Sequence, residues 1–288
     1  MSTESEQIVD TFGQATELNL GNPLRNEQLV TLESGGEVWI AGDVHDHRRN
    51  FEKLLKSADL TNNPQRHIIL QELIHGEHFD ADGAEDSWQI LYKAAQLKAE
   101  FPDQVHFLLA NHDLAQIHGK GIMKGSISVC EAFNKGVKKA FGSTSGAMVQ
   151  VGITEFLLSF PLGIRLPNQI FCCHSLPTDA EVPVYDYSVF TRPLTGADYQ
   201  RKTGPVYQLI WGRHTTPPFA RQFADSMETN LLITGHQPQE MGFGLNGENQ
   251  IIIASDHNQG ICLQINMDET YDIEGLAGCA KKFVAMDV

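Results

Sequence analysis

Short apolar runs rich in β-branched residues recur along this chain of 288 residues. Each run is four or five residues long and ends at polar or turn-forming residues, which is typical of buried or half-buried strands. The sequence therefore predicts strands at residues 37–41, 67–70, 105–109, 169–173, 231–234, 251–254 and 261–265.

Segments with helical periodicity separate the early runs. Residues 49–57 and 85–100 each place apolar side chains on one face, and the second segment stops before Pro102. This alternation predicts βαβ units with parallel strands in the N-terminal half. After a helical region at about 127–141 and 146–160 the predicted strands come closer together, which indicates a second, more antiparallel sheet.

Ligand-type side chains stand where the apolar runs stop. Asp43 and His45 follow the first run, and residues two apart on a strand point the same way, so one metal ion could be held by both. Later runs end at Glu72, Asn111, His174 and His236. Because ligands gather outside the carboxyl ends of strands in an open α/β sheet, we expect these residues to meet. Their carboxylate, imidazole and amide groups suit Mn, Fe or Zn better than a thiolate-bound structural zinc.

Composition and charge are those of a globular enzyme. Hydrophobic residues make up 41% and charged residues 20% of the chain, and no apolar run reaches the roughly 18 residues that span a membrane. The N-terminus is acidic, so a cytoplasmic location is the default expectation. The net charge is −15, which argues against nucleic acid as a partner. The five cysteines lack C-x-x-C spacing and are expected to be free thiols.

The polar residues form an ordered series that resembles the motifs of calcineurin-like metallophosphoesterases, most closely the phosphoprotein phosphatase branch. The matching segments are Gly42-Asp43-Val44-His45, Gln71-Glu72-Leu73-Ile74-His75-Gly76, Ala110-Asn111-His112-Asp113, Cys173-His174-Ser175 and Gly235-His236-Gln237-Pro238. The resemblance runs from about residue 38 to 265. It implies an α/β fold, a four-layer α-β-β-α sandwich with mixed sheets. We expect residues 1–30 to be an N-terminal extension and residues 31–288 a single domain.

The resemblance also implies a binuclear metal centre. One ion would be held by Asp43, His45 and Glu72, with Glu72 bridging, and the second would be completed by Asn111, His174 and His236. Two adjacent cations lower the pKa of a shared water and clamp the phosphate oxygens during in-line attack. His112 resembles the histidine that protonates the leaving-group oxygen.

The second motif departs from the family pattern. The family bridge is an aspartate, and Glu72 is one methylene longer. The family's Asp-Arg-Gly becomes His75-Gly76-Glu77, so His75 replaces the aspartate that orients the histidine acid. A neutral His75 accepts a hydrogen bond from His112 but stabilises an imidazolium less than a carboxylate would, which predicts a lower pKa for the acid.

The motif also lacks its phosphate-binding arginine, so another guanidinium is expected to take that role. Arg48 and Arg49 follow the first motif at a predicted helix N-terminus, where backbone amides favour anions. Arg213 is the third candidate. The alternative for all three is an ordinary surface arginine.

The resemblance implies hydrolysis of a phosphomonoester, with a phosphoprotein as the favoured substrate. Phosphotyrosine and dinucleoside polyphosphates are alternatives within the same chemistry. A different class is a metal-binding interaction protein that has lost turnover, which the replacement at His75 and Gly76 favours and the retained ligand series disfavours.

Overall fold

The first three apolar runs build one β-sheet in the computed structural model, which describes residues 3–119, 121–179 and 184–287. In spatial order its strands are β14 (Ala280–Lys282), β13 (Ile261–Asn266), β3 (Glu37–Asp43), β4 (Arg66–Gln71) and β5 (Val105–Leu108). The last three run parallel, as predicted, while β13 and β14 join antiparallel. The connections contain α2 (Arg48–Ala58), the 3-10 turn η1 (Leu60–Asn62) and α3 (Trp88–Glu100).

A second sheet has seven strands. In spatial order they are β1 (Arg25–Asn26), β2 (Leu29–Thr31), β8 (Gly163–Leu166), β9 (Ile170–Cys172), β10 (Leu231–Thr234), β12 (Gln250–Ile253) and β11 (Phe243–Asn246). The prediction of a more antiparallel sheet is correct only in part, because three pairings are antiparallel while β9, β10 and β12 in the centre run parallel. The helices α6 (Pro205–Trp211) and α7 (Pro217–Ser226) connect β9 to β10, and such a crossover is what parallel neighbours need.

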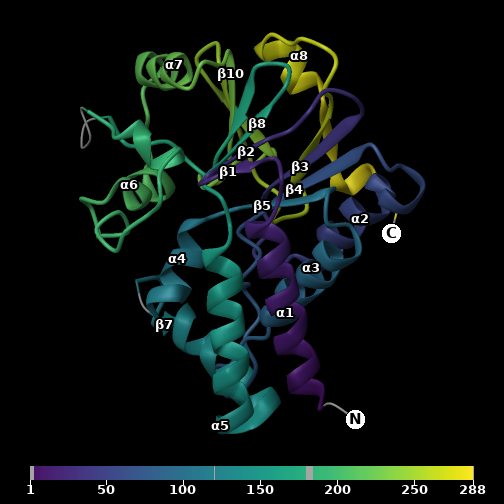
Figure 1. The fold of residues 1–288 in the computed structure, drawn as a ribbon, viewed down its shortest axis with the longest axis vertical. Helices are drawn as coiled ribbons and strands as arrows, with labels where there is room; N and C mark the ends of the chain where they lie inside the picture. Colours follow the sequence, from purple (N-terminus) through teal and green to yellow (C-terminus); the bar gives the residue numbers. More distant parts are fainter. Residues whose placement is uncertain (1–2, 120, 180–183, 288) are drawn as a thin grey trace.

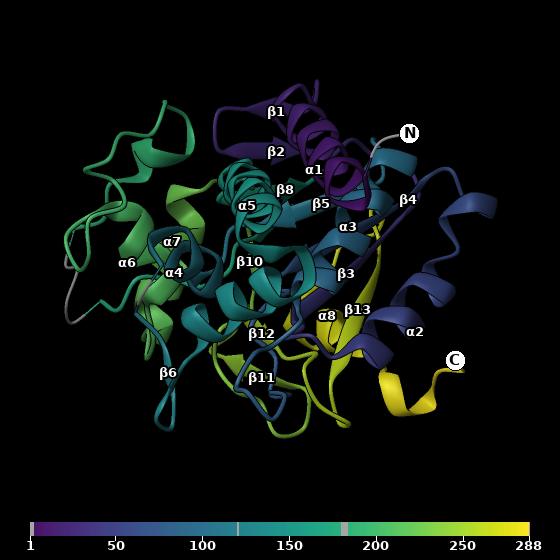
Figure 2. The same ribbon diagram turned by 90° about the horizontal axis from the view of Figure 1, so that it is seen from below.

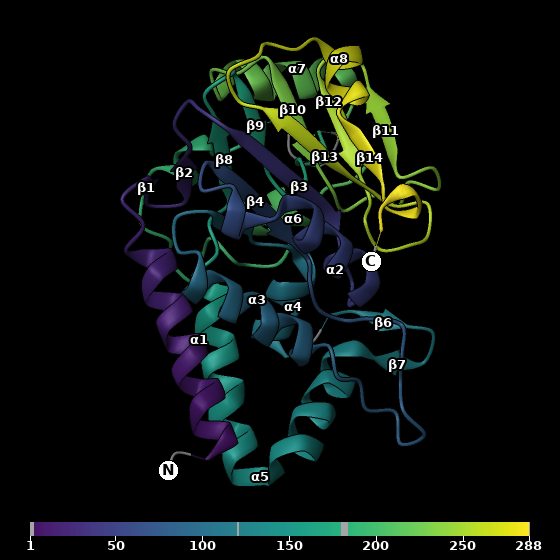
Figure 3. The ribbon, with the colours of Figure 1, turned by 90° about the vertical axis from the view of Figure 1, so that its right-hand side faces the viewer.

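The two sheets pack face to face, and helices cover the outer face of each, which gives the expected four-layer α-β-β-α order (Figures 1 and 3). Ile40 and Ile69 from the first sheet and Ile170 and Ile233 from the second share one buried cluster between the sheets. Alternate side chains point outward. Trp39 therefore joins a different cluster, which includes the apolar faces of the helices.

The remaining elements complete the outer layers. They are α1 (Glu4–Leu20), α4 (Asn111–His118), the hairpin of β6 (Met123–Lys124) and β7 (Ile127–Ser128), α5 (Val129–Leu158), η2 (Tyr187–Phe190), α8 (Ile273–Gly278) and η3 (Phe283–Ala285). The two helical segments predicted near residues 127–160 form the two arms of α5, which bends at Gly142 where φ is 76° (Figure 3). No helix in the described ranges is long and apolar enough to cross a membrane.

The N-terminal segment packs onto the helical layer. Thr3 and Glu6 form a capping box at the start of α1, and α1 lies beside the second arm of α5 (Figure 2). Phe12 is fully buried, and its ring centroid is 5.5 Å from that of Phe156. The division of the chain at residue 30 stays a prediction. The capping box and the helical spacing of the buried Ile8, Phe12 and Ala15 were both sequence signals for α1.

Candidate metal centre

The loops that follow five strands of the two sheets converge on one pocket. Its volume is about 90 Å³, and it is lined by Asp43, His45, Glu72, Asn111, His112, Arg213, His236, Gln237, Pro238, Ala254 and Asp256. His174, just after β9, is fully buried and within 3.7 Å of the Glu72 carboxylate. The structure thus brings together all six residues predicted as metal ligands, and His112 and Arg213 with them.

Unusual backbone conformations place these side chains. His45, Glu72, His75 and His236 all have φ between 43° and 68°, in the left-handed region that residues other than glycine rarely adopt. Each such residue costs roughly 1–3 kcal/mol and persists because the surrounding structure fixes it. Such strain clusters at functional sites, and here it turns the chain sharply at the ends of three strands.

Hydrogen bonds across the sheets hold the edge together. The His236 N–H donates to Asp43 Oδ1 at 2.9 Å, and the Gly235 N–H donates to the His174 carbonyl at 2.9 Å. At α4 the Asp113 carboxylate accepts the Ala110 N–H at 2.9 Å, which anchors the helix start that carries Asn111. The ligand-type side chains are therefore supported by contacts between segments far apart in the sequence.

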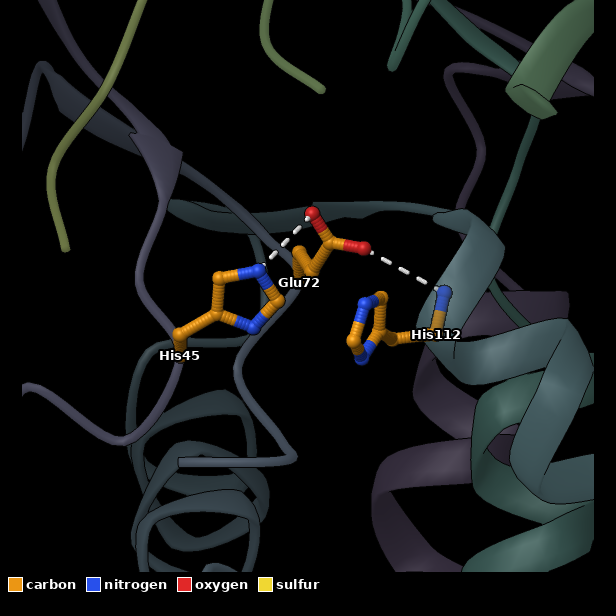
Figure 4. Close-up of side chains that lie close together, drawn as sticks. All are labelled: His45, Glu72 and His112. Atoms are coloured by element: carbon orange, nitrogen blue, oxygen red, sulfur yellow. Dashed lines mark hydrogen bonds and ion pairs between the residues drawn. The ribbon is translucent and has the colours of Figure 1, made fainter. Parts of the chain in front are cut away.

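Glu72 lies at the centre of the group, between two imidazoles (Figure 4). Its Oε2 is 3.5 Å from His45 Nε2, and its Oε1 accepts the backbone N–H of His112 at 3.2 Å. Burial raises the pKa of Asp43, and burial together with the Asp43 charge raises the pKa of Glu72 well above its usual range. Two buried carboxylates that interact in this way favour a nearby cation, because it would offset their mutual repulsion.

The donor set fits metal ions. One ligand atom each from Glu72, His174 and His236 lie within 4.8 Å of one another, and the same holds for His45, Glu72 and His112. His174 Nε2 is also 2.9 Å from Asn111 Oδ1. Oxygen and imidazole nitrogen ligands converge here in a buried place, and this is the arrangement that binds first-row divalent ions.

His112 is held by a second histidine. His75 Nδ1 and His112 Nδ1 are 3.0 Å apart, and His75 Nε2 is 3.0 Å from Gln116 Oε1. Gln116 donates through Nε2 to Asn134 Oδ1, so its oxygen faces His75, which must donate from Nε2. His75 Nδ1 then carries a lone pair and accepts the Nδ1–H of His112. This leaves His112 Nε2 available for chemistry.

Both imidazoles of this pair favour the neutral form. Burial lowers the pKa of His75 to about 3. Burial, and then the neighbouring His45 and His75, lower the pKa of His112 well below its ordinary value. Because burial is the main cause of this shift, the effect of the missing aspartate on the pKa of His112 stays a prediction.

The comparison with protein families decides the assignment. The family model described as calcineurin-like phosphoesterase matches residues 36–244, which is more than half of the chain. The chain belongs to the calcineurin-like phosphoesterase family. It is therefore a metal-dependent hydrolase acting on phosphoric esters.

Solved structures of phosphatases share this calcineurin-like fold. A protein serine/threonine phosphatase from Saccharomyces cerevisiae, described as similar to human phosphatase PP5, matches with a TM-score of 0.71 at 14% identity, over 99% of this chain and 91% of that one. A cold-active protein-tyrosine phosphatase of a psychrophilic Shewanella species matches with a TM-score of 0.59 at 15% identity, over 93% and 84%. No curated protein sequence matches the chain significantly.

The phosphoesterase pocket receives one of the three predicted arginines. Arg213 lines it and donates from Nε to His236 Nε2 at 3.1 Å. Arg48 is turned away into ion pairs with Asp46 at 2.9 Å and Asp86 at 2.6 Å. Arg49 lines a neighbouring hollow that also contains Arg48. The structure therefore brings Arg213 to the metal centre and leaves Arg48 and Arg49 beside it.

The altered second motif of this phosphoesterase has a steric reason. A Cβ atom on Gly76 would lie 2.7 Å from the Asp46 Cβ, which is closer than real Cβ contacts. A side chain at position 76, such as the arginine of the family motif, would therefore collide with Asp46 unless the turn shifts. Lys124 from the β6–β7 hairpin approaches the same turn and donates to the His75 carbonyl at 2.9 Å.

Sequence reasoning missed several residues around the site. Gln71 contacts His174, and Gln116 contacts His75. Asp256, just after β12, also lines the pocket; it stands at the end of an apolar run but matches no ligand position of the family motifs, so it was given no role. The spacing of Gln116, one helical turn after His112, was a usable signal. Gln71 had none, because its amide is not a common metal ligand.

Proposed function

We propose that this phosphoesterase hydrolyses phosphomonoesters at a binuclear metal centre, and that its substrates are phosphoproteins. The single observation that carries the proposal is the convergence of six ligand-type side chains on one buried edge. On this proposal Asp43, His45 and Glu72 would hold one ion and Asn111, His174 and His236 would hold the other, with Glu72 shared between them. When bound, two Mn, Fe or Zn ions supply an activated water and neutralise phosphate oxygens.

His112 is the proposed general acid. Its ring centroid is 4.5 Å from that of His45, and it lines the pocket directly beside the ligand group. His75 accepts a hydrogen bond from the Nδ1–H of His112. His112 Nε2 is therefore the atom that would donate a proton to the leaving-group oxygen. Once His112 is protonated, His75 stabilises it by a hydrogen bond without adding a negative charge.

Arg213 is the proposed phosphate-binding residue. A guanidinium presents several donors to phosphate oxygens, and the contact of Arg213 with His236 places it next to the metal centre. In Arg213→Ala we expect the inhibition constant for inorganic phosphate to rise roughly 10- to 100-fold, the loss of one hydrogen bond to a charged group. Metal content should stay unchanged. Arg49→Ala is the matched control, and an equal effect in both variants would contradict this role.

The preference for phosphoproteins is supported by the overall fold of the yeast serine/threonine phosphatase and the Shewanella tyrosine phosphatase. Dinucleoside polyphosphates are the alternative within the same chemistry. A panel of phosphoserine, phosphothreonine and phosphotyrosine peptides assayed beside dinucleoside polyphosphates separates them. Faster turnover of the polyphosphates would overturn the preference. A cytoplasmic location stays a prediction.

The first test of the proposal is metal analysis followed by hydrolysis of p-nitrophenyl phosphate with added Mn²⁺. We expect two ions per chain and turnover that His236→Ala abolishes. Two bound ions without turnover on any phosphoester would instead support an interaction protein that has lost catalysis. The absence of metal binding would refute the binuclear centre itself.

A further inference from the structure

We infer that Gln71 is a positioning residue that fixes His174 as a metal ligand through Nε2. This inference rests on the proposed metal centre and adds a residue that the ligand series does not contain. Gln71 is the last residue of β4, directly before Glu72, and only 1% of its surface is exposed.

The orientation of the Gln71 amide follows from its neighbours. Its Nε2 donates to the Ala41 carbonyl at 3.0 Å. A carbonyl oxygen only accepts, so the amide nitrogen must face Ala41 and the amide oxygen must face the other way. That oxygen, Oε1, is 2.8 Å from His174 Nδ1. His174 therefore donates from Nδ1 to Gln71.

This hydrogen bond fixes the tautomer of His174. A neutral imidazole with its proton on Nδ1 carries a lone pair on Nε2. Nε2 is 2.9 Å from Asn111 Oδ1 and 3.7 Å from Glu72 Oε2. In this tautomer Nε2 and two oxygen atoms bring three lone-pair donors together in a fully buried place, which a cation held among them would satisfy. The other tautomer would put a proton where the metal ion has to bind.

The fold makes room for this contact at two points. The pairing of β3 with β4 shifts register between Ile40 and Asp43, next to the carbonyl that accepts from Gln71. On the opposite side, a Cβ atom on Gly235 would lie 3.1 Å from Gln71 Oε1 and 2.3 Å from Asp43 Oδ1. Gln71 therefore ties the first sheet to the ligand at the end of β9 in the second sheet.

Hydrogen bonds from outside the ligand set orient metal-binding histidines and raise their basicity, and losing one typically weakens metal binding 10- to 100-fold. Gln71→Met keeps the length of the side chain and removes both hydrogen bonds. We expect this variant to bind the ion held by Asn111 and His174 roughly 10- to 100-fold more weakly. The ion held by Asp43 and His45 should be less affected.

Gln250→Met is the matched control. Gln250 is equally buried, donates to Thr234 Oγ1 at 2.9 Å and accepts from Asn246 at 2.7 Å, and lies at the start of β12, away from the ligand edge. Metal-depleted wild type and both variants are titrated with Mn²⁺ by calorimetry. Both variants should melt at lower temperature, but only Gln71→Met should lose metal affinity. Equal affinity in the two variants would overturn the inference.

A second measurement needs no metal and no variant. The ¹⁵N shifts of His174 in the metal-free wild type report which ring nitrogen is protonated. We expect Nδ1 to be protonated, because Gln71 Oε1 accepts its proton in a hydrogen bond, and an unprotonated Nδ1 would refute the role of Gln71. A wild type that binds no Mn²⁺ yet shows this tautomer would refute the proposed metal centre instead, so the two failures are distinguishable.

Discussion

Two histidine pairs lie at opposite ends of the same two strands. His67, near the start of β4, and His106, in β5, have Nδ1 and Nε2 3.0 Å apart. His75 and His112 follow the carboxyl ends of those strands, and their Nδ1 atoms are also 3.0 Å apart. Burial lowers the pKa of all four histidines. The two pairs are therefore alike in the distance between their nitrogen atoms and in the direction of their pKa shifts.

The pairs differ in what surrounds them. Next to His106, the buried ammonium group of Lys98 donates to the carbonyls of Pro102 and Val105, so it is occupied by the backbone. Next to His112 lies the Glu72 carboxylate, which accepts its backbone N–H. A hydrogen-bonded histidine pair is therefore not by itself a site. The convergence of carboxylates and further imidazoles at the carboxyl ends of the strands distinguishes the functional pair.

The largest expected effect is a loss of activity that follows substitution in the His75–His112 pair but not in the His67–His106 pair. In His112→Asn we expect kcat for phosphoserine peptides to fall roughly 10²- to 10⁴-fold through loss of the general acid. The loss should be smaller for p-nitrophenyl phosphate, whose leaving group needs little protonation. His106→Asn is the control, and its folded fraction should keep wild-type kcat. Equal losses on both substrates would argue against acid catalysis by His112.

A smaller effect is expected from restoring a carboxylate beside His112. In His75→Asp the new charge should raise the pKa of His112, which burial holds well below its usual value. The acid acts in its protonated form, so activity is lost as pH rises through this pKa. The alkaline limb of the kcat profile should therefore move to higher pH. An unchanged limb would mean that another group controls it.

The smallest effect concerns stability alone. His106 is neutral in the folded protein because burial lowers its pKa, whereas in the unfolded chain it titrates near pH 6.5. Stability is therefore fully present above about pH 6.5 and is lost below it, by up to about 1.4 kcal/mol per pH unit for one such group. When the pH is lowered from 7.5 to 5.5, the free energy of unfolding measured in urea should fall less in His106→Asn than in wild type. The exposed His78→Asn should behave like wild type.

Much of the site could be predicted from the sequence, because it is built where apolar runs stop. Residue type and position after an apolar run were enough to predict metal ligands at Asp43, His45 and Asn111. The contacts that adjust the chemistry are set by three-dimensional proximity instead. The hydrogen bond between Gln71 and His174 joins residues from two sheets, and residue type gives no sign of it.

The fold could be predicted in outline for the same reason. The apolar runs became strands, whereas β8 and β11 escaped notice because β8 is flanked by proline and β11 contains and is flanked by glycine. The parallel centre of the second sheet depends on the crossover through α6 and α7. This crossover was not predicted, because the sequence around both helices shows little helical periodicity. Helix α1 was missed because residues 1–30 were expected to be an extension, although Ile8, Phe12 and Ala15 have helical spacing.

The contact between Gly76 and Asp46 limits how this protein can change. Any side chain introduced at position 76 meets the Cβ atom of Asp46, which every residue except glycine at position 46 would keep. Replacing Asp46 also removes its ion pair with Arg48. Because the two positions touch, we expect the effects of substitutions at them to be non-additive. A substitution at either position therefore changes which residues the other position tolerates.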